Sequence, residues 1–284
     1  VGASERSAEQ RLTNLKTNLM INDLLLDDFP EVCFPIRHLG RSARKAEGQK
    51  HAGEPTAISW KAKRVVLPTI KSKAAGNSKV KFSKSSGTVI EVFGITGELR
   101  GMNHQLEDGS IVRPSLAICD DPQTRESANS VSQSAERERV LAGDIAFLAG
   151  PGEPIAVVMP CTVIYEDDMA ENMLNRDKHP EWRGERTSMV QSFPTNEKLW
   201  DDYADIQREC LRADGTTEPA TEFYAENRAA MDRGAVVTWP ARYRNDELSG
   251  IQHAMNLRIR DEHAFWSECQ NTPIIASTEL DMLN

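Results

Sequence analysis

The segment RPSLAICDDPQ, residues 113–123, places two adjacent carboxylates directly after a short apolar run. The run Leu116–Cys119 is bounded by prolines, and its length predicts a strand that is buried on both faces. Adjacent side chains at a strand end point to opposite sides unless the backbone bends, so Asp120 and Asp121 can take separate roles. One carboxylate can hold a hydrated Mg²⁺ ion while the other accepts a proton from water, as in the Walker B element of nucleotide hydrolases. A solvated turn after a strand is the alternative.

Length, composition and charge limit the classes of protein to which the chain can belong. The chain has 284 residues, enough for one large domain or two smaller ones, and a formal net charge of −9. No apolar stretch is long enough to cross a membrane, and the first residues lack the pattern of a secretion signal. The five cysteines include no CxxC pair, which suits a reducing compartment and argues against a disulfide framework or a structural zinc site.

Positive charge is concentrated between Arg41 and Lys84. This stretch holds 12 Lys and Arg against 2 acids, a balance of +10, and the rest of the chain carries −19. Such asymmetry is compatible with a basic face that meets a polyanion. A solvated loop without a partner is the alternative, because only Trp60 and Phe82 offer aromatic rings for base stacking.

The helical spacing of apolar residues near the start of the chain predicts a helix that Ser4 caps and that ends near Leu26. The next apolar segment, residues 29–36, contains two prolines and is expected to be extended. Further strands are predicted over 56–60, 64–67, 88–96 and 155–159, and a helix over 126–149. This alternation favours a mostly parallel sheet covered by helices.

After residue 192 the pattern is mainly helical. Trp200, Tyr203, Ile206 and Cys210 fall close to one helical face and are expected to pack in a core. We therefore divide the chain into a sheet-containing domain, 1–192, and a helical region, 193–284.

Six segments occur in the order typical of one family: GITGELRG, RPSLAICDDPQT, IAVVMPCTVIYEDDM, HPEWRGER, FPTNEKLWDDY and EHAFWSECQN. Through them nearly the whole chain resembles the large terminase subunit of tailed bacteriophages. The resemblance implies a RecA-like P-loop ATPase fold with a mostly parallel sheet, followed by a helical linker toward a nuclease domain. It also implies a function: a motor that packages double-stranded viral DNA into the procapsid with Mg²⁺ and ATP, in the host cytoplasm. The implied partners are the portal protein, the small terminase subunit and further copies in a ring.

The resemblance also implies roles for individual residues. Asp120 resembles the aspartate that organises Mg²⁺ for ATP, and Asp121 stands where the family has its water-activating acid, which is commonly Glu in related ATPases. Thr162 resembles the polar residue that senses the γ-phosphate. Arg100, within LRG, resembles the arginine offered as a finger to the ATP of a neighbouring subunit.

The chain departs from the family pattern at both ends. No GxxxxGK followed by Ser or Thr occurs, and in the family this P-loop would precede Val1. The acidic cluster of the nuclease would follow Asn284, and the missing initiator Met fits a processed or truncated chain. The chain thus resembles the central part of a terminase, and we expect it to hydrolyse ATP poorly or not at all by itself, because no loop cradles the phosphates.

Two other classes stay open. The first is a non-enzymatic assembly or DNA-binding module, a degenerate ATPase fold from a prophage remnant. The second is a metal-dependent nuclease with the two aspartates as ligands, although two adjacent acids are few for that chemistry. His179, Glu181 and Glu185 are too loosely spaced for a recognisable zinc site.

Overall fold

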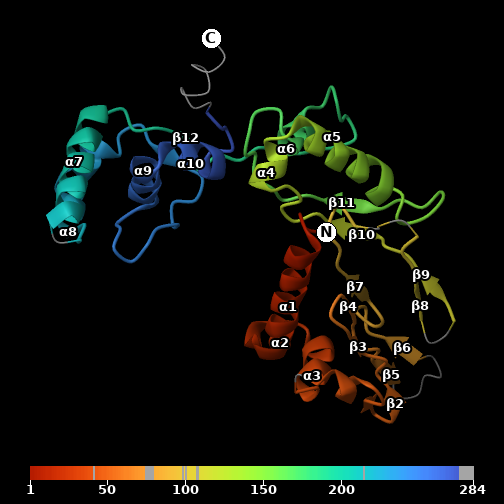
Figure 1. Ribbon diagram of the computed structural model, residues 1–284. Coiled ribbons are helices and arrows are strands. Elements are labelled where there is room, and N and C mark those ends of the chain that lie inside the picture. The colour runs from red at the N-terminus through yellow and green to blue at the C-terminus, as the bar shows by residue number, and fades with distance from the viewer. Residues whose placement is uncertain are drawn as a thin grey trace. The chain divides into compact units, whose positions relative to one another are not determined.

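The computed structural model describes residues 1–40, 42–73, 80–97, 99, 101–106, 109–213 and 215–274. Within them the chain is mixed α/β, 43% helical and 12% strand, with small sheets, which confirms the predicted mixed class. Two compact units are present, the first made of Val1–Ser127 with Ser132–Cys161, the second of Ala128–Val131 with the chain from Thr162 onward (Figure 1). The boundary predicted at residue 192 lies inside the second unit. Across the described ranges, no helix combines the length and the apolar character needed to cross a membrane.

The first unit opens with three helices: α1 (Glu5–Ile21), α2 (Asp23–Asp28) and α3 (Pro30–His38). Ser4 caps α1 as expected, because its side chain accepts a hydrogen bond from the backbone N–H of Ser7. The helix stops earlier than predicted, since the Asn22 side chain accepts from the N–H groups of the next turn and starts α2 instead.

The prediction of an extended segment over 29–36 is wrong, because α3 occupies it. Pro30 stands in the first turn, where its missing N–H has no intrahelical partner to lose. Pro35 lies inside the helix, and burial of one apolar face outweighs the unfavourable effect of that proline. This face packs against α1 and one strand, in a core of Leu12, Leu19, Val32, Cys33, Ile36, Val65 and Leu67.

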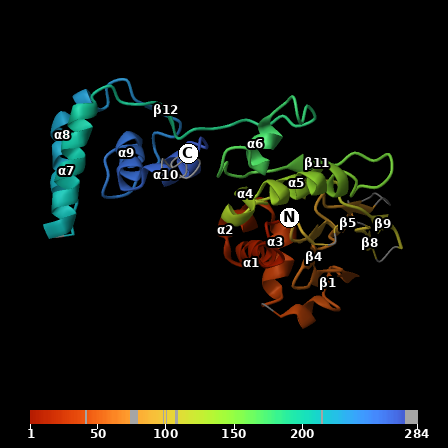
Figure 2. The same cartoon turned by 45° about the horizontal axis from the view of Figure 1, so that its top comes forward.

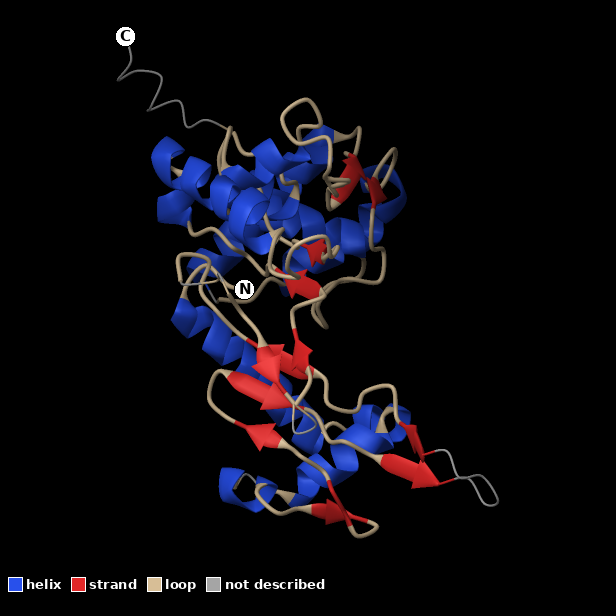
Figure 3. Ribbon diagram, turned by 90° about the vertical axis from the view of Figure 1, so that its right-hand side faces the viewer, coloured by secondary structure: helices blue, strands red, loops and turns tan. Residues whose placement is uncertain are grey.

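The strands of the first unit are short (Figure 3). They are β1 (Lys50–His51), β2 (Glu54–Pro55), β3 (Ser59–Trp60), β4 (Arg64–Val66), β5 (Lys71–Lys73), β6 (Val80–Phe82), β7 (Val89–Glu91), β8 (His104–Gln105), β9 (Ile111–Val112), β10 (Leu116–Ile118) and β11 (Ala156–Val158). The order β3-β4-β7 forms a three-stranded antiparallel sheet, and β1-β2, β5-β6 and β8-β9 are antiparallel pairs. Among the described residues, parallel pairing is confined to β10-β11 and to two bridges of Gly2.

The helix predicted over 126–149 is divided. Its parts are α4 (Arg125–Ala128), α5 (Val131–Arg139) and the π-helical turn η2 (Val140–Ile145). The serine-rich stretch around this break, residues 127–134, offers side-chain hydrogen bonds that compete with a continuous helix.

The second unit is mainly helical, as predicted. It contains α6 (Met169–Leu174), β12 (Val190–Ser192), α7 (Glu197–Ala213), α8 (Glu218–Met231), β13 (Val236–Val237), α9 (Gly250–Arg260), α10 (Glu262–Ala264) and η3 (Phe265–Cys269). Helices α7 and α8 lie side by side (Figure 2). Trp200 and Tyr203 of α7 are buried in their core, which confirms the packing role predicted for that helical face.

A buried polar network holds the start of α9 in this core. The Glu247 carboxylate contacts His253 Nδ1 at 2.7 Å and accepts from the side-chain amide of Asn256 at 2.9 Å and the backbone N–H of Arg244 at 2.8 Å. Asn256 Oδ1 in turn accepts from the Tyr203 hydroxyl at 2.8 Å. Burial raises the pKa of Tyr203, so its hydroxyl stays protonated and available as a donor.

Candidate functional site

The aspartate pair lies where two parallel strands end. Strands β10 and β11 pair with Leu116 opposite Ala156 and Ile118 opposite Val158. The pairing continues past the strands, since Asp121 N–H donates to the Pro160 carbonyl at 3.0 Å. The carboxyl ends of both strands therefore meet at the edge that carries the two acids.

The strand β10 is buried on one face only, so the prediction of burial on both faces is wrong. Ala117 and Cys119 point into the first unit, whereas Leu116 and Ile118 are 53% and 52% exposed. Val158 of β11 is also exposed and extends this apolar strip. Side chains alternate with period two along a strand, so these three residues share the second, partly exposed face.

The first two residues add a third parallel segment on the other side of β10. Asp120 N–H donates to the Val1 carbonyl at 2.9 Å, and Gly2 N–H donates to the Phe93 carbonyl at 2.9 Å. Gly2 thereby forms parallel bridges to both Gly94 and Asp120. Because α1 begins three residues later, the helix starts at the same edge as the acid pair.

A backbone bend lets both acids face α1. Asp121 has a φ of +43°, in the left-handed region that non-glycine residues seldom adopt. Arg11 of α1 donates from Nε to a carboxylate oxygen of Asp120 in a short hydrogen bond, and its Nη2 lies 3.6 Å from Asp121 Oδ2. The two carboxylates thus share one cation and do not point to opposite sides of the strand.

The loop after the pair is tied to α5 by a buried arginine. Arg137 Nε donates to the Pro122 carbonyl at 3.3 Å, and its Nη1 donates to the Gln133 carbonyl at 3.2 Å. Burial lowers the pKa of the Arg137 guanidinium, although the group stays charged at neutral pH. This contact fixes the backbone immediately after Asp121.

The donor set of the pair fits Mg²⁺. This ion binds through one or two carboxylates and keeps several water ligands, and both carboxylates are partly exposed to solvent. A zinc site needs at least three such protein ligands. Over the described residues, no group of three or more His, Cys, Asp and Glu side chains is placed to hold a metal. The neighbouring Cys119 does not extend the set, because burial raises the pKa of its thiol and keeps it protonated.

Neither of the other two predicted site residues belongs to the described part of the first unit. Thr162 is half-buried and is the first residue of the long segment of the second unit. Arg100 lies outside the described residues.

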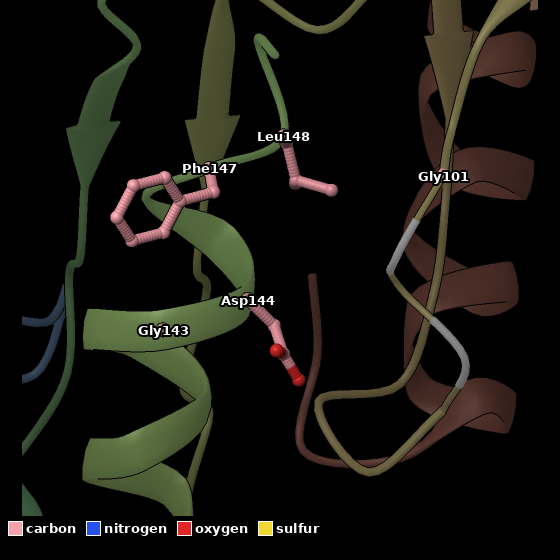
Figure 4. A pocket seen from close by; sticks show the side chains of 5 residues that line it. All are labelled: Gly101, Gly143, Asp144, Phe147 and Leu148. Carbon is pink, nitrogen blue, oxygen red and sulfur yellow. The ribbon is translucent and has the colours of Figure 1, made fainter. Parts of the chain in front are cut away.

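A depression of about 400 Å³ is lined by Gly101, Gly143, Asp144, Phe147 and Leu148. Gly101 directly follows Arg100 in the sequence. Figure 4 shows the Asp144 carboxylate extending from η2 toward the segment that carries Gly101. Among the described residues, this lining is apolar with one acid and without a basic side chain, which does not suit a phosphate group. The acid pair is therefore the better candidate site.

Other acids and histidines have structural roles. Asp168 caps α6, since its Oδ1 accepts from the Glu171 N–H at 2.9 Å. Asp201 and Asp202 lie on the exposed face of α7. His179 contacts Glu181 at 3.2 Å in a surface pair.

The basic segment 41–84 is partly neutralised. Lys63 pairs with Glu5, Arg64 pairs with Glu91 at 2.7 Å, and Lys71 pairs with Glu54 at 3.1 Å. Five exposed cations of the segment form no ion pair with a described carboxylate: Arg44, Lys45, Lys50, Lys61 and Lys84.

Arg11 is the residue of the site that the sequence did not reveal. Its only local signal is its position beside the buried apolar face of α1, formed by Ala8 and Leu12. Many surface arginines share that signal. No family model, curated protein or solved structure matches the chain.

Proposed function

We propose that this chain belongs to an ATP-driven motor that packages double-stranded viral DNA, of the kind that large terminase subunits form. The observation that carries the proposal is the position of Asp120 and Asp121 at the carboxyl end of β10, with parallel neighbours on both sides. Ligands of open α/β sheets bind at this edge. The parallel order 93–95, 1–2, β10 and β11 supports a RecA-like sheet.

Each residue then has a defined task. Asp120 would hold a hydrated Mg²⁺ ion, which would screen phosphate charge, and Asp121 would accept a proton from the attacking water. Thr162 would, by the same resemblance, sense the terminal phosphate. Arg100 neutralises charge on the nucleotide of an adjacent subunit.

A titration of Mg²⁺ and ATP into the purified chain, followed by calorimetry, tests this proposal. We expect weak saturable binding with little turnover, and at least about tenfold weaker binding in Asp120→Asn, because one metal-binding oxygen is lost. Asp201→Asn, which makes the same change on the exposed face of α7, is the control and should bind like the parent. Binding that Asp120→Asn leaves unchanged would refute the site.

The second candidate is a non-catalytic assembly module. The exposed apolar strip of Leu116, Ile118 and Val158 favours it, because another protein segment can pack on such a surface and bury it. The calorimetric experiment separates the two. No heat with Mg²⁺ and ATP, together with salt-sensitive binding to duplex DNA, would leave the assembly module as the better account.

The basic segment predicts DNA binding that depends on salt but not on sequence. Replacing Arg44, Lys45 and Lys50 by Gln should reduce the slope of log K against log salt by roughly 2 to 3, since each phosphate contact contributes about 0.9. Fluorescence anisotropy with a labelled duplex at several salt concentrations measures this. The control variant replaces Arg139, Arg208 and Arg212 by Gln, which removes the same charge outside the basic segment. An equal loss of slope in both variants would exclude a specific role of the segment.

A further inference from the structure

Arg11 is held in place by the packing of α1. The buried residues Ala8 and Leu12 fix the adjacent helix face, and the capping box at Ser4 fixes the start of the helix. The guanidinium therefore reaches the acid pair from a rigid element. Its partners within the described residues are Asp120, Asp121 and, at 3.5 Å, the carbonyl of Ser7 in its own helix.

The guanidinium and a metal ion need the same oxygens. A divalent cation such as Mg²⁺ must approach a carboxylate oxygen to about 2.1 Å. Arg11 Nε already donates to Asp120 Oδ2, so a guanidinium cation stands at this oxygen. Both cations cannot occupy the Asp120 oxygen, so one must leave when the other binds.

We propose that Arg11 is a gate on the acid pair, occupying the place of a divalent cation and turning away when Mg²⁺ binds. The inference rests on the proposed function only in assigning Mg²⁺ to Asp120. The Arg11 side chain is 37% exposed, so its long stem has a path into solvent without unfolding of α1. Without the gate, the two carboxylates would repel each other and attract a cation more strongly. Arg11 is thus a positioning residue that sets the metal affinity.

Metal binding alone tests the gate, with no nucleotide present. The free Mn²⁺ concentration, measured by electron paramagnetic resonance in titrations of the full chain, gives the affinity of each variant. Arg11→Gln should bind Mn²⁺ about tenfold more tightly, because the competing cation is gone while the carboxylates remain. Arg11→Lys keeps a cation that cannot span both carboxylates. Its affinity for Mn²⁺ should therefore lie between those of the parent and Arg11→Gln.

Arg6→Gln is the matched control, since it removes the same charge from an exposed position of the same helix. Its affinity should stay within about twofold of the parent, because solvent screens the lost charge. Circular dichroism checks that every variant folds. Asp120→Asn combined with Arg11→Gln should lose the tight binding.

The outcomes distinguish a failure of the gate alone from a failure of the metal site. If the parent binds Mn²⁺ through Asp120 and Arg11→Gln binds no more tightly than Arg6→Gln, the gate is refuted and the metal site stands. If only Arg11→Gln binds, both are supported. If no variant binds Mn²⁺, the metal site fails and the gate fails with it.

Discussion

Replacing Glu247 by alanine is expected to lower the free energy of unfolding of the second unit by roughly 3–5 kcal/mol, because the change removes the buried carboxylate that contacts the His253 ring. Glu247 and His253 are each 8% exposed, and their contact spans 2.7 Å. The substitution also leaves the Asn256 amide and the Arg244 N–H without their acceptor. Buried donors without partners are costly, since water cannot replace the lost contact.

Urea unfolding followed by tryptophan fluorescence measures this effect, since Trp200 lies in the same core. Glu226→Ala, on the exposed side of α8, removes the same group and should change the free energy of unfolding by no more than about 0.5 kcal/mol. Glu247→Gln keeps the shape of the side chain and one acceptor oxygen. Its loss of unfolding free energy should fall between those of Glu247→Ala and Glu226→Ala. A loss below about 1 kcal/mol in Glu247→Ala would contradict the structural role of the network.

Replacing Gly94 by alanine is expected to destabilise the first unit by roughly 1–3 kcal/mol, because the added methyl group has no room. A Cβ at this position would lie 2.5 Å from the backbone N of Glu5 and 2.8 Å from the backbone C of Ser4. These are backbone atoms at the start of α1, so no change of rotamer relieves the collision. The helix must shift, and Arg11 shifts with it away from Asp120.

Gly143→Ala is the control, since a Cβ there meets nothing within 4 Å. Urea unfolding should show little change in this variant and a clear loss in Gly94→Ala. The Mn²⁺ titration adds a second readout, because displacement of Arg11 should alter metal affinity in Gly94→Ala alone. Equal stability of the two variants would show that α1 does not pack against Gly94 this closely.

Local patterns determined much of the secondary structure. The amphipathic spacing around Trp200 and Tyr203 predicted α7, and Ser4 predicted the start of α1. The apolar run before Asp120 likewise predicted β10. These features follow from side-chain periodicity and capping, which act over a few residues and are therefore readable from sequence.

Local rules failed where burial decided between conformations. The prolines of 29–36 suggested an extended segment, yet an apolar face available to α1 made α3 a helix. Burial on both faces of β10 was inferred from an apolar run, but the number of covered faces depends on which segments pack against the strand. Packing energies of this kind involve residues far apart in the sequence.

The sequence by itself determined that two carboxylates follow a strand, and through this it identified Asp120 and Asp121 as candidates for metal chemistry. Only the tertiary structure decided what faces them. Arg11 meets Asp120 across 109 residues of chain, because Gly2 and Gly94 allow α1 to begin beside the ends of parallel strands. No local pattern encodes that meeting, since it depends on how separate segments pair, and pairing is set by the backbone hydrogen bonds and close packing of the whole unit.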